Sequence, residues 1–332
     1  MPSRYSSAHE KTNGPGDARP TALHIVKDEG LEGKLTDKVV LITGCSSGIG
    51  IETARAMAAT GARVFAGVRN VAKGEDALGD ILKSGRVELL KMDLNSLESV
   101  RQAAEEFKGK SEGLNILINN AGIMATPQGT TADGFESQLG TNHLSHFLLF
   151  QLLKPLLLSS STPSSSSRVI CLSSSGHRTH GILFSDYNFS STPYNPWIAY
   201  GQSKTANIYM ANEIDRRYGA KGIHAMSVMP GGIMSGLQAH VDPGMKAMFE
   251  RPEVVKIMKN TEQGAATSVY AAVGKEWEGK GGIYLEDCEE QGVVDRSKGA
   301  SAPGVAEWAF DEEGERRLWK DSCGMVRVED DA

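Results

Sequence analysis

One segment constrains the fold of this chain more than any other: Thr43-Gly44-Cys45-Ser46-Ser47-Gly48-Ile49-Gly50. It directly follows the apolar run 39–42 and leads into a helix-forming sequence at 52–59. A strand, a glycine-rich turn and a helix in this order form a cradle for a pyrophosphate. Glycine permits the tight turn and close approach of the backbone, and the first N–H groups of the helix point at the anion.

The rest of the chain alternates between strand-like and helix-like segments. Strand-like runs stand at 39–43, 63–68, 87–92, 114–119, 169–172, 223–228 and 282–284, and helical patterns at 48–60, 75–83, 96–108, 135–158, 198–218 and 261–273. This alternation predicts an α/β fold, a single doubly wound Rossmann-type parallel sheet of about seven strands with helices on both faces. A kink is expected at Pro155, inside the fourth helical segment.

Three stretches define the predicted domain organisation. Residues 31–332 are predicted to form a single dinucleotide-binding catalytic domain, because the alternation runs through them without a break. The irregular segments 175–197 and 236–259 are expected to be substrate loops, since ligands of open α/β sheets lie beyond the carboxyl ends of the strands. Residues 1–30 are polar and have no apolar core like that of a signal peptide, so we expect a flexible N-terminal extension.

Composition narrows the class of protein. The net charge of -6 and the scattered basic residues argue against nucleic acid as a partner. No apolar run reaches the roughly 18 residues that span a bilayer. The four cysteines form no CxxC pair, which favours reduced thiols in a cytoplasmic protein. His143 and His146 have no matched carboxylate or cysteine, so we expect no metal site.

Tyr200 and Lys204 stand four residues apart in a helical pattern and therefore share one helix face. A cation close to a tyrosine lowers the pKa of its hydroxyl, which then exchanges a proton with a carbonyl or alcohol oxygen. A pair at this spacing also arises by chance, so it gains weight only with other elements. The run 173–175 follows the strand at 169–172, where a hydroxyl can hold a substrate oxygen, although serines also simply form turns.

Other strand ends suit a bound dinucleotide. The turn 119–122 would let a cofactor lie close to the backbone, or is an ordinary loop. Asp93 could accept a hydrogen bond from an adenine amino group, or cap the next helix. Arg69 follows the second strand, where an acidic residue would bind the ribose of NAD and a forked guanidinium suits the 2′-phosphate of NADP(H). Val68 fills the acidic position, so we predict NADP(H), with a solvent-exposed arginine as the alternative.

In this order, these elements resemble the short-chain dehydrogenase/reductases of the single-domain type. The matching motifs are Thr43-Gly44-xxx-Gly48-Ile49-Gly50, Asp93, Asn119-Asn120-Ala121-Gly122, Asn142, Ser174, Tyr200-xxx-Lys204 and Pro230-Gly231. The resemblance covers the chain from about Leu35 onward. The segments 122–124, 141–149 and 195–200 are similar to the retinol-dehydrogenase and WW-domain-oxidoreductase branch.

The resemblance implies a role for each matching residue. Tyr200 would be the general acid/base, and Ser174 would hold the substrate oxygen. Lys204 would lower the pKa of Tyr200 and bind the nicotinamide ribose, and Asn142 would hold a water in a proton relay. The cofactor would be bound by Gly44, Ser46, Ser47, Gly48, Ile49, Gly50, Arg69, Asp93, Leu94, Asn120, Ala121, Gly122, Tyr200, Lys204, Pro230, Gly231, Ile233 and Ser235.

These features predict an NADP(H)-dependent oxidoreductase that reduces a ketone or aldehyde, or oxidises the matching alcohol, of an apolar or aromatic small molecule. The expected pocket residues are Met245, Met248, Phe249, Met258 and Phe184. One alternative is an NAD-dependent alcohol dehydrogenase of the same fold. Another is a non-catalytic dinucleotide-sensing interaction protein, which would be expected to lack Tyr200, Lys204 or Ser174. A sugar-nucleotide epimerase relative would usually space its glycines as GxxGxxG. Family resemblance suggests a homodimer or homotetramer.

Overall fold

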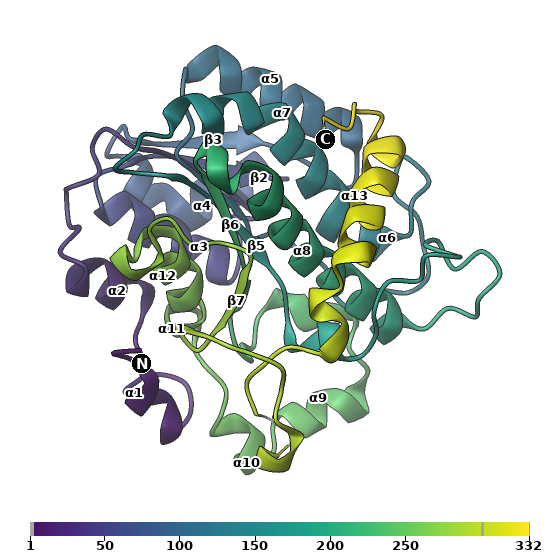
Figure 1. Cartoon of the computed structure of the whole chain (residues 1–332). Helices are drawn as coiled ribbons and strands as arrows, with labels where there is room; N and C mark the ends of the chain where they lie inside the picture. Colours follow the sequence, from purple (N-terminus) through teal and green to yellow (C-terminus); the bar gives the residue numbers. More distant parts are fainter. Residues whose placement is uncertain (1–2, 300–301, 332) are drawn as a thin grey trace.

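The computed structural model describes residues 3–299 and 302–331. Its centre is an eight-stranded sheet in the order β3-β2-β1-β4-β5-β6-β7-β8 (Figure 1). The strands are β1 Val39–Thr43, β2 Arg63–Val68, β3 Val87–Lys91, β4 Ile116–Asn119, β5 Ser167–Leu172, β6 Ile223–Met229, β7 Ile283–Glu286 and β8 Glu289–Glu290. Strands β1 to β7 are parallel, and the short β8 pairs antiparallel with β7. The predicted α/β fold is confirmed, with β8 as an unpredicted addition.

Helices cover both faces of this sheet. They are α1 Ser6–Glu10, α2 Ala22–Asp28, α3 Ile49–Ala59, α4 Val71–Leu82, α5 Leu97–Lys110, α6 Ser137–Leu139, α7 Ser145–Ser160, α8 Pro196–Tyr218, α9 Pro243–Phe249, α10 Pro252–Val255, α11 Thr261–Gly264, α12 Ala266–Val273 and α13 Glu312–Val326. Short 3-10 turns span Ser175–Arg178, Gly219–Lys221, Gly236–His240, Lys275–Trp277, Arg296–Lys298 and Glu307–Phe310, and a π-helical turn spans Gly140–Leu144. Within the described residues, no helix combines the length and apolarity that crossing a bilayer requires.

The central strands are buried on both faces, which explains their continuous apolar runs. Leu41 packs into the core formed with α5, α7 and α8, whereas its neighbours Val40 and Ile42 pack into the opposite core, formed with α2, α3 and α12. This alternation follows from the pleat of a strand, which points successive side chains to opposite faces. The sheet therefore divides the molecule into two hydrophobic cores.

Strand register brings the carboxyl ends of the central strands to one edge of the sheet. Thr43 at the end of β1 pairs with Gly67 on β2, and Asn119 at the end of β4 pairs with Cys171 on β5. Leu172 pairs with Val228 on β6. The residues that follow these strands consequently converge on the same edge, although they are far apart in the sequence.

The fourth predicted helix, 135–158, is interrupted in the structure. It consists of the short helix α6, the π-helical turn Gly140–Leu144 and the longer helix α7, which contains Pro155. The departure from regular α-helix thus lies at Gly140–Leu144. A π-turn inserts one extra residue into the helical ladder and is often found at functional sites.

The N-terminal residues pack against the domain, and their expected flexibility stays a prediction. The side chains of Tyr5 and of Ile25 and Val26 in α2 are buried in the core that α2 and α12 help to form. Arg19 is only 3% exposed despite its charge. A few apolar side chains spaced along a polar segment are sufficient to hold it against the domain. Whether residues 31–332 would form a domain without this segment remains a prediction.

Candidate active site

A cavity of about 1240 Å³ opens at the carboxyl edge of the sheet. It is lined by the glycine-rich turn after β1, by the ends of β2 to β7, by α8 and by residues 236–259, here called the flap. All the residues predicted to bind the cofactor line this cavity, together with Ser174, Tyr200 and Lys204. Asn142 lies behind the wall and is fully buried. The structure therefore brings the predicted residues together, whereas their roles remain predictions.

The glycines after β1 allow two chain segments to approach closely. Gly44 has a φ of +76°, and a methyl group on it would lie 2.8 Å from the Cβ of Ala121. A methyl group on Gly50 would lie 2.2 Å from the carbonyl oxygen of Gly44. The turn is thus as compact as glycine allows, and it leads into the N-terminus of α3. This is the arrangement that an anionic pyrophosphate needs.

Thr43, which the sequence analysis did not single out, fastens this turn to the end of β4. Its hydroxyl oxygen accepts hydrogen bonds from the backbone N–H groups of Asn120 and Ala121, each at 3.0 Å. The Asn120 side chain donates to the carbonyl oxygen of Thr43 at 2.8 Å. The hydroxyl also lies 2.9 Å from Nε2 of His146. Thr43 therefore ties the β1 turn, the β4 turn and α7 together.

The tautomer of His146 follows from its two partners. Its Nδ1 lies 2.9 Å from the carbonyl oxygen of Asn142, which can only accept, so Nδ1 carries the proton. Nε2 then accepts from the Thr43 hydroxyl. Burial lowers the pKa of His146 to about 4, which keeps the ring neutral and this arrangement intact at neutral pH. The spacing of four residues between Asn142 and His146 was the only signal for this contact in the sequence.

Asn142 lies in the π-helical turn and holds the residues after β4. Its Oδ1 accepts from the Ile123 N–H at 2.9 Å, and its Nδ2 donates to the Ile123 carbonyl and to the Ser203 hydroxyl, each at 2.9 Å. Lys204 lies just across Gly122, because a methyl group there would lie 3.3 Å from both Asn142 Oδ1 and Lys204 Nζ. The described contacts show Asn142 as a support for this turn. Its expected water-holding role stays a prediction.

Tyr200 and Lys204 are positioned by the first turns of α8. The helix begins after Asn195, whose side chain accepts from the N–H groups of Trp197 and Ile198 at 2.9 and 3.1 Å, and Pro196 occupies its first position. Lys204 Nζ lies 5.7 Å from the centre of the Tyr200 ring and donates to the Leu172 carbonyl at 3.0 Å. One helix face thus presents both side chains at the end of β5, as their spacing predicted.

Burial controls the acidity of this pair. It raises the pKa of Tyr200 to about 12, although a hydrogen bond with the Ser174 side chain acts in the opposite direction. Burial also lowers the pKa of Lys204 to about 8. The sequence had suggested that Lys204 would lower the pKa of Tyr200. In the structure the exclusion of water dominates, so the neutral phenol is favoured.

The serine run after β5 separates into distinct environments. The Ser173 hydroxyl is buried and donates to the Lys204 carbonyl at 3.0 Å, so it supports α8. The Ser174 hydroxyl lines the cavity and accepts from the Gly176 N–H at 3.1 Å. Gly176 itself is a further requirement that the sequence did not reveal. A methyl group on it would lie 2.6 Å from Cε1 of Tyr200, so only glycine leaves room for the ring.

Apolar side chains surround Tyr200 on the side away from the glycine-rich turn. It packs with Met124, Ala125 and Val241, and the partly buried residues Trp197, Leu237, Met245 and Phe249 complete this cluster. Met245, Phe249 and Met258 line the cavity as expected. The expectation was wrong for two residues. Met248 is 44% exposed. The centre of the Phe184 ring lies 6.1 Å from that of Tyr187 and 4.4 Å from the guanidinium carbon of Arg317 in α13.

Two charged residues lie toward the far end of the cavity. Arg69 follows β2, is exposed, and has no hydrogen-bond or ion-pair partner within residues 3–299 and 302–331. Asp93 follows β3 and accepts from the Asn95 N–H at 3.0 Å within the turn, whereas the next helix, α5, is capped by Ser96. A free guanidinium at the mouth of a glycine-lined cradle is suited to an anionic ligand.

Known proteins resemble this chain over most of its length. A family model described as short chain dehydrogenase matches residues 38–246. The chain is 55% identical over 326 residues to the short-chain dehydrogenase/reductase prx1 of Penicillium roqueforti, covering 98% of this chain and 95% of that protein. It is 37% identical over 298 residues to retinol dehydrogenase 12 of Homo sapiens, covering 89% and 88%. The resemblance to this family and to its retinol-dehydrogenase branch is confirmed.

A solved structure shows the same arrangement of elements. The RhlG/NADP active-site complex of Pseudomonas aeruginosa aligns with a TM-score of 0.60 at 26% identity, covering 77% of this chain and 96% of that one. The alignment extends the family match from the sequence to the three-dimensional fold.

Proposed function

The chain belongs to the short-chain dehydrogenase family, and on this premise we propose that it is an NADP(H)-dependent reductase of a ketone or aldehyde. The observation that carries the proposal is the position of Tyr200. Tyr200 lines the same cavity as the glycine-rich cradle, Ser174 and Lys204, and it also packs within the apolar cluster. In this proposal Tyr200 is the proton donor to an apolar carbonyl compound that meets a bound nicotinamide in the cavity.

The residues present fit a phosphorylated dinucleotide. The close approach at Gly44 and Gly50 leaves no room for a side chain, and the N-terminus of α3 faces this space. Arg69 has no partner within the described residues, and the preceding position is the buried, apolar Val68 rather than an acid. A guanidinium here favours a 2′-phosphate. The presence of NADP in the similar Pseudomonas aeruginosa complex supports the same choice.

The chain's own residues would move the proton. A bound reduced nicotinamide supplies hydride to the carbonyl carbon. Tyr200, whose pKa burial raises to about 12, remains a neutral phenol and donates its proton to the carbonyl oxygen. The Ser174 hydroxyl holds that oxygen by a hydrogen bond. The Lys204 cation stabilises the phenolate that remains until a proton returns.

The apolar cluster defines the substrate class. Met245 and Phe249 come from the flap, and Trp197 stands at the start of α8 with its ring 6.3 Å from that of Tyr200. Such walls bind hydrocarbon or aromatic surface, and methionine adapts to varied shapes. We therefore infer an apolar or aromatic carbonyl compound with its oxygen toward Ser174.

The test is a panel of ketones, aldehydes and quinones followed by the loss of NADPH absorbance, with NADH run in parallel. The variant Tyr200→Phe should lose about 100-fold or more of the turnover with the best substrate, because it cannot donate a proton. NADPH binding, measured by fluorescence, should remain nearly unchanged. Tyr187→Phe is the matched control, since its hydroxyl binds Asp321 near α13. Equal turnover in Tyr200→Phe would contradict the mechanism.

A further inference from the structure

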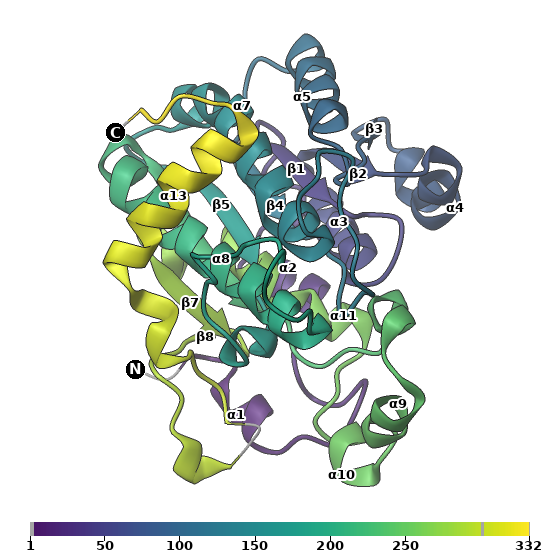
Figure 2. The same cartoon turned by 90° about the vertical axis from the view of Figure 1, so that its right-hand side faces the viewer.

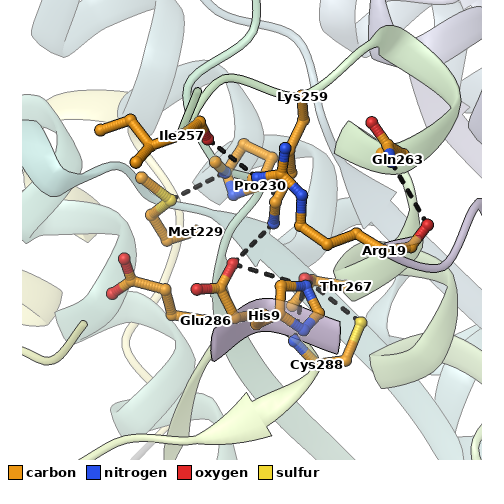
Figure 3. A network of polar contacts seen from close by, with 12 residues as sticks. His9, Arg19, Met229, Pro230, Ile257, Lys259, Gln263, Thr267, Glu286 and Cys288 are labelled. Atoms are coloured by element: carbon orange, nitrogen blue, oxygen red, sulfur yellow. Dashed lines mark hydrogen bonds and ion pairs between the residues drawn. The ribbon is translucent and has the colours of Figure 1, made fainter. Parts of the chain in front are cut away.

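The N-terminal arm, residues 3–21, forms part of the cavity wall. Ser6, His9, Glu10, Thr12 and Arg19 all line the cavity. The proposed function gives these five residues no role, because the cradle and the proton donor belong to other elements. Figure 3 shows His9 and Arg19 on the purple N-terminal ribbon, beside Lys259 and Ile257 at the end of the flap.

The arm grips the flap where it returns to the domain. The Gly14 N–H donates to the Lys256 carbonyl at 2.9 Å. The Arg19 guanidinium then donates to the next two carbonyls in sequence, that of Ile257 at 2.8 Å (Figure 3) and that of Met258 at 2.5 Å. Three successive carbonyls of the flap are thus bound by the arm. A forked guanidinium suits this task because its donors diverge in one plane.

The same end of the flap supports the wall after β6. The Lys259 N–H donates to the Gly232 carbonyl at 2.8 Å, and its Nζ donates to the Pro230 carbonyl at 3.2 Å and to Asp287 at 2.7 Å. The side chain lies directly against Gly231, where a methyl group would be 2.7 Å from its Cδ. Residues 230–232 line the cavity, and Pro230 and Gly231 are among the residues that the family resemblance assigns to the cofactor. The arm, the end of the flap and residues 230–232 are therefore joined in this order by hydrogen bonds.

The arm is anchored on both sides of Arg19 by contacts that do not involve the flap. Tyr5 packs edge-on against Tyr270, with 5.3 Å between ring centres. Ile25 and Val26 of α2 are fully buried in the sheet core. Loss of the Arg19 side chain would also remove its contacts within the arm, to Asp17 at 2.8 Å and to the Gly14 carbonyl at 3.1 Å, but these anchors should keep the arm docked while the end of the flap is released.

We propose that Arg19 is a positioning residue for carbonyl reduction. It joins the arm to the flap end, and so holds Met258 and Lys259 behind the wall at 230–232. This inference rests on the proposed function for its effect on catalysis. Its effect on the flap does not depend on that function, because it follows from the contacts of Arg19 alone.

The experiment uses the full chain with Arg19→Met, which retains the aliphatic stem but cannot donate a hydrogen bond. Trypsin can cut after Lys256, an exposed residue whose own carbonyl and the next one are held by the arm. Cleavage there should become about tenfold faster, since a buried donor to the flap is lost. The matched control is Arg4→Met in the same arm, because Arg4 pairs with Glu29 and Asp28 and is 49% exposed.

Kinetics provide the second readout. In Arg19→Met, kcat/KM for the best carbonyl substrate should fall about tenfold, while the Kd of NADPH stays within about twofold. In the proposed function the dinucleotide's phosphates bind at Gly44 to Gly50 and Arg69, and within the described residues none of these is hydrogen-bonded to Arg19 or to the flap end. Arg19→Lys should recover part of both effects, because an ammonium can still reach one carbonyl.

The outcomes separate the inference from the proposed function. The inference would be overturned if Arg19→Met were cleaved after Lys256 at the wild-type rate. It would also be overturned if Arg4→Met raised the rate of this cleavage equally. Faster cleavage throughout the chain with a lower melting temperature would also overturn it, because Arg19 would then be a general stabilising residue. If the wild-type protein reduces no carbonyl compound, the proposed function fails, and the proteolysis result still decides whether Arg19 holds the flap.

Discussion

At the scale of single residues, burial shifts the pKa values of Tyr200 and Lys204 in opposite directions. The pKa of Tyr200 is raised to about 12, so the phenol keeps its proton across the working range. The pKa of Lys204 is lowered to about 8, so its charge is complete only below that pH. In the proposed function this pair would serve reduction, in which the tyrosine donates a proton and the lysine stabilises the resulting phenolate.

This arrangement predicts a one-sided pH profile for reduction. The kcat/KM should be flat at low pH and fall above about pH 8, as Lys204 loses its proton and its charge. The measurement is NADPH-dependent reduction between pH 5.5 and 10, in overlapping buffers. Ser174→Ala should lower the whole profile without moving its midpoint, since serine does not titrate there. A profile that stays flat to pH 10 would exclude Lys204 as the titrating group.

The sequence identified the residues of the site where local spacing carries the information. Tyr200 and Lys204 share a helix face, and Ser174 directly follows a strand, so their convergence could be predicted from the parallel sheet. Thr43 and Gly176 could not be recognised, because their partners lie on segments far away along the chain. The rise in the pKa of Tyr200 could not be predicted for a related reason, since burial depends on the packing of all neighbouring elements.

At the scale of elements, the proposed function assigns the choice of cofactor to the turn between β2 and α4. Arg69 follows the last residue of β2, and Asn70 caps α4 by accepting from the Lys73 N–H at 3.0 Å. The cap fixes the turn, while the guanidinium lines the cavity without a partner among the residues that the structure describes. Arg69→Asp should raise KM for NADPH about tenfold to 100-fold, because a charge-assisted contact is replaced by repulsion. KM for NADH should fall or stay unchanged.

Lys73→Ala is the control for this exchange. Lys73 lies in the first turn of the same helix and is exposed, but it does not line the cavity. Its removal should change KM for NADPH by less than about threefold. Steady-state kinetics with both dinucleotides measure the effect. An unchanged KM for NADPH in Arg69→Asp would show that the 2′-phosphate is bound elsewhere or is absent.

The boundaries of helices α6 and α7 could not be predicted from the apolar spacing of the sequence. The apolar spacing of residues 135–158 is helical throughout, so it predicted one helix and a kink at Pro155. The π-helical turn at Gly140–Leu144 leaves no mark in that spacing, because it adds a single residue and the segment is buried on all sides. In the same way, the polar composition of residues 1–30 outweighed the few apolar residues that hold the segment in place.

At the scale of the whole molecule, α13 covers the outer surface of α7 and α8 (Figures 1 and 2). Trp319 is 2% exposed and packs edge-on against Phe147 at 4.9 Å and Phe150 at 6.1 Å. Ser322 of the same helix lies 2.9 Å from Nε2 of His143 in the π-helical turn. This helix therefore supports the turn that carries Asn142 without lining the cavity.

Trp319→Ala should destabilise the protein by about 3–5 kcal/mol, the usual cost of removing a large buried aromatic side chain. The thermal midpoint should fall by about 6–20 °C, while kcat at 25 °C should change little. The exposed Phe310→Ala, next to the same helix, is the control and should change the free energy of unfolding by less than about 0.5 kcal/mol. A midpoint unchanged in Trp319→Ala would show that α13 contributes little to stability.

The cover formed by α13 has a consequence for biosynthesis. The helix begins at Glu312, whereas α8 ends at Tyr218, so a ribosome completes the covered helices well before their cover. In the interval the emerging polypeptide presents Phe147, Phe150 and Tyr218 to water, as a surface to which chaperones bind. Translation that stalls before residue 312 would leave that surface permanently bare, and the truncated product would be a substrate for quality-control proteases rather than a smaller working enzyme.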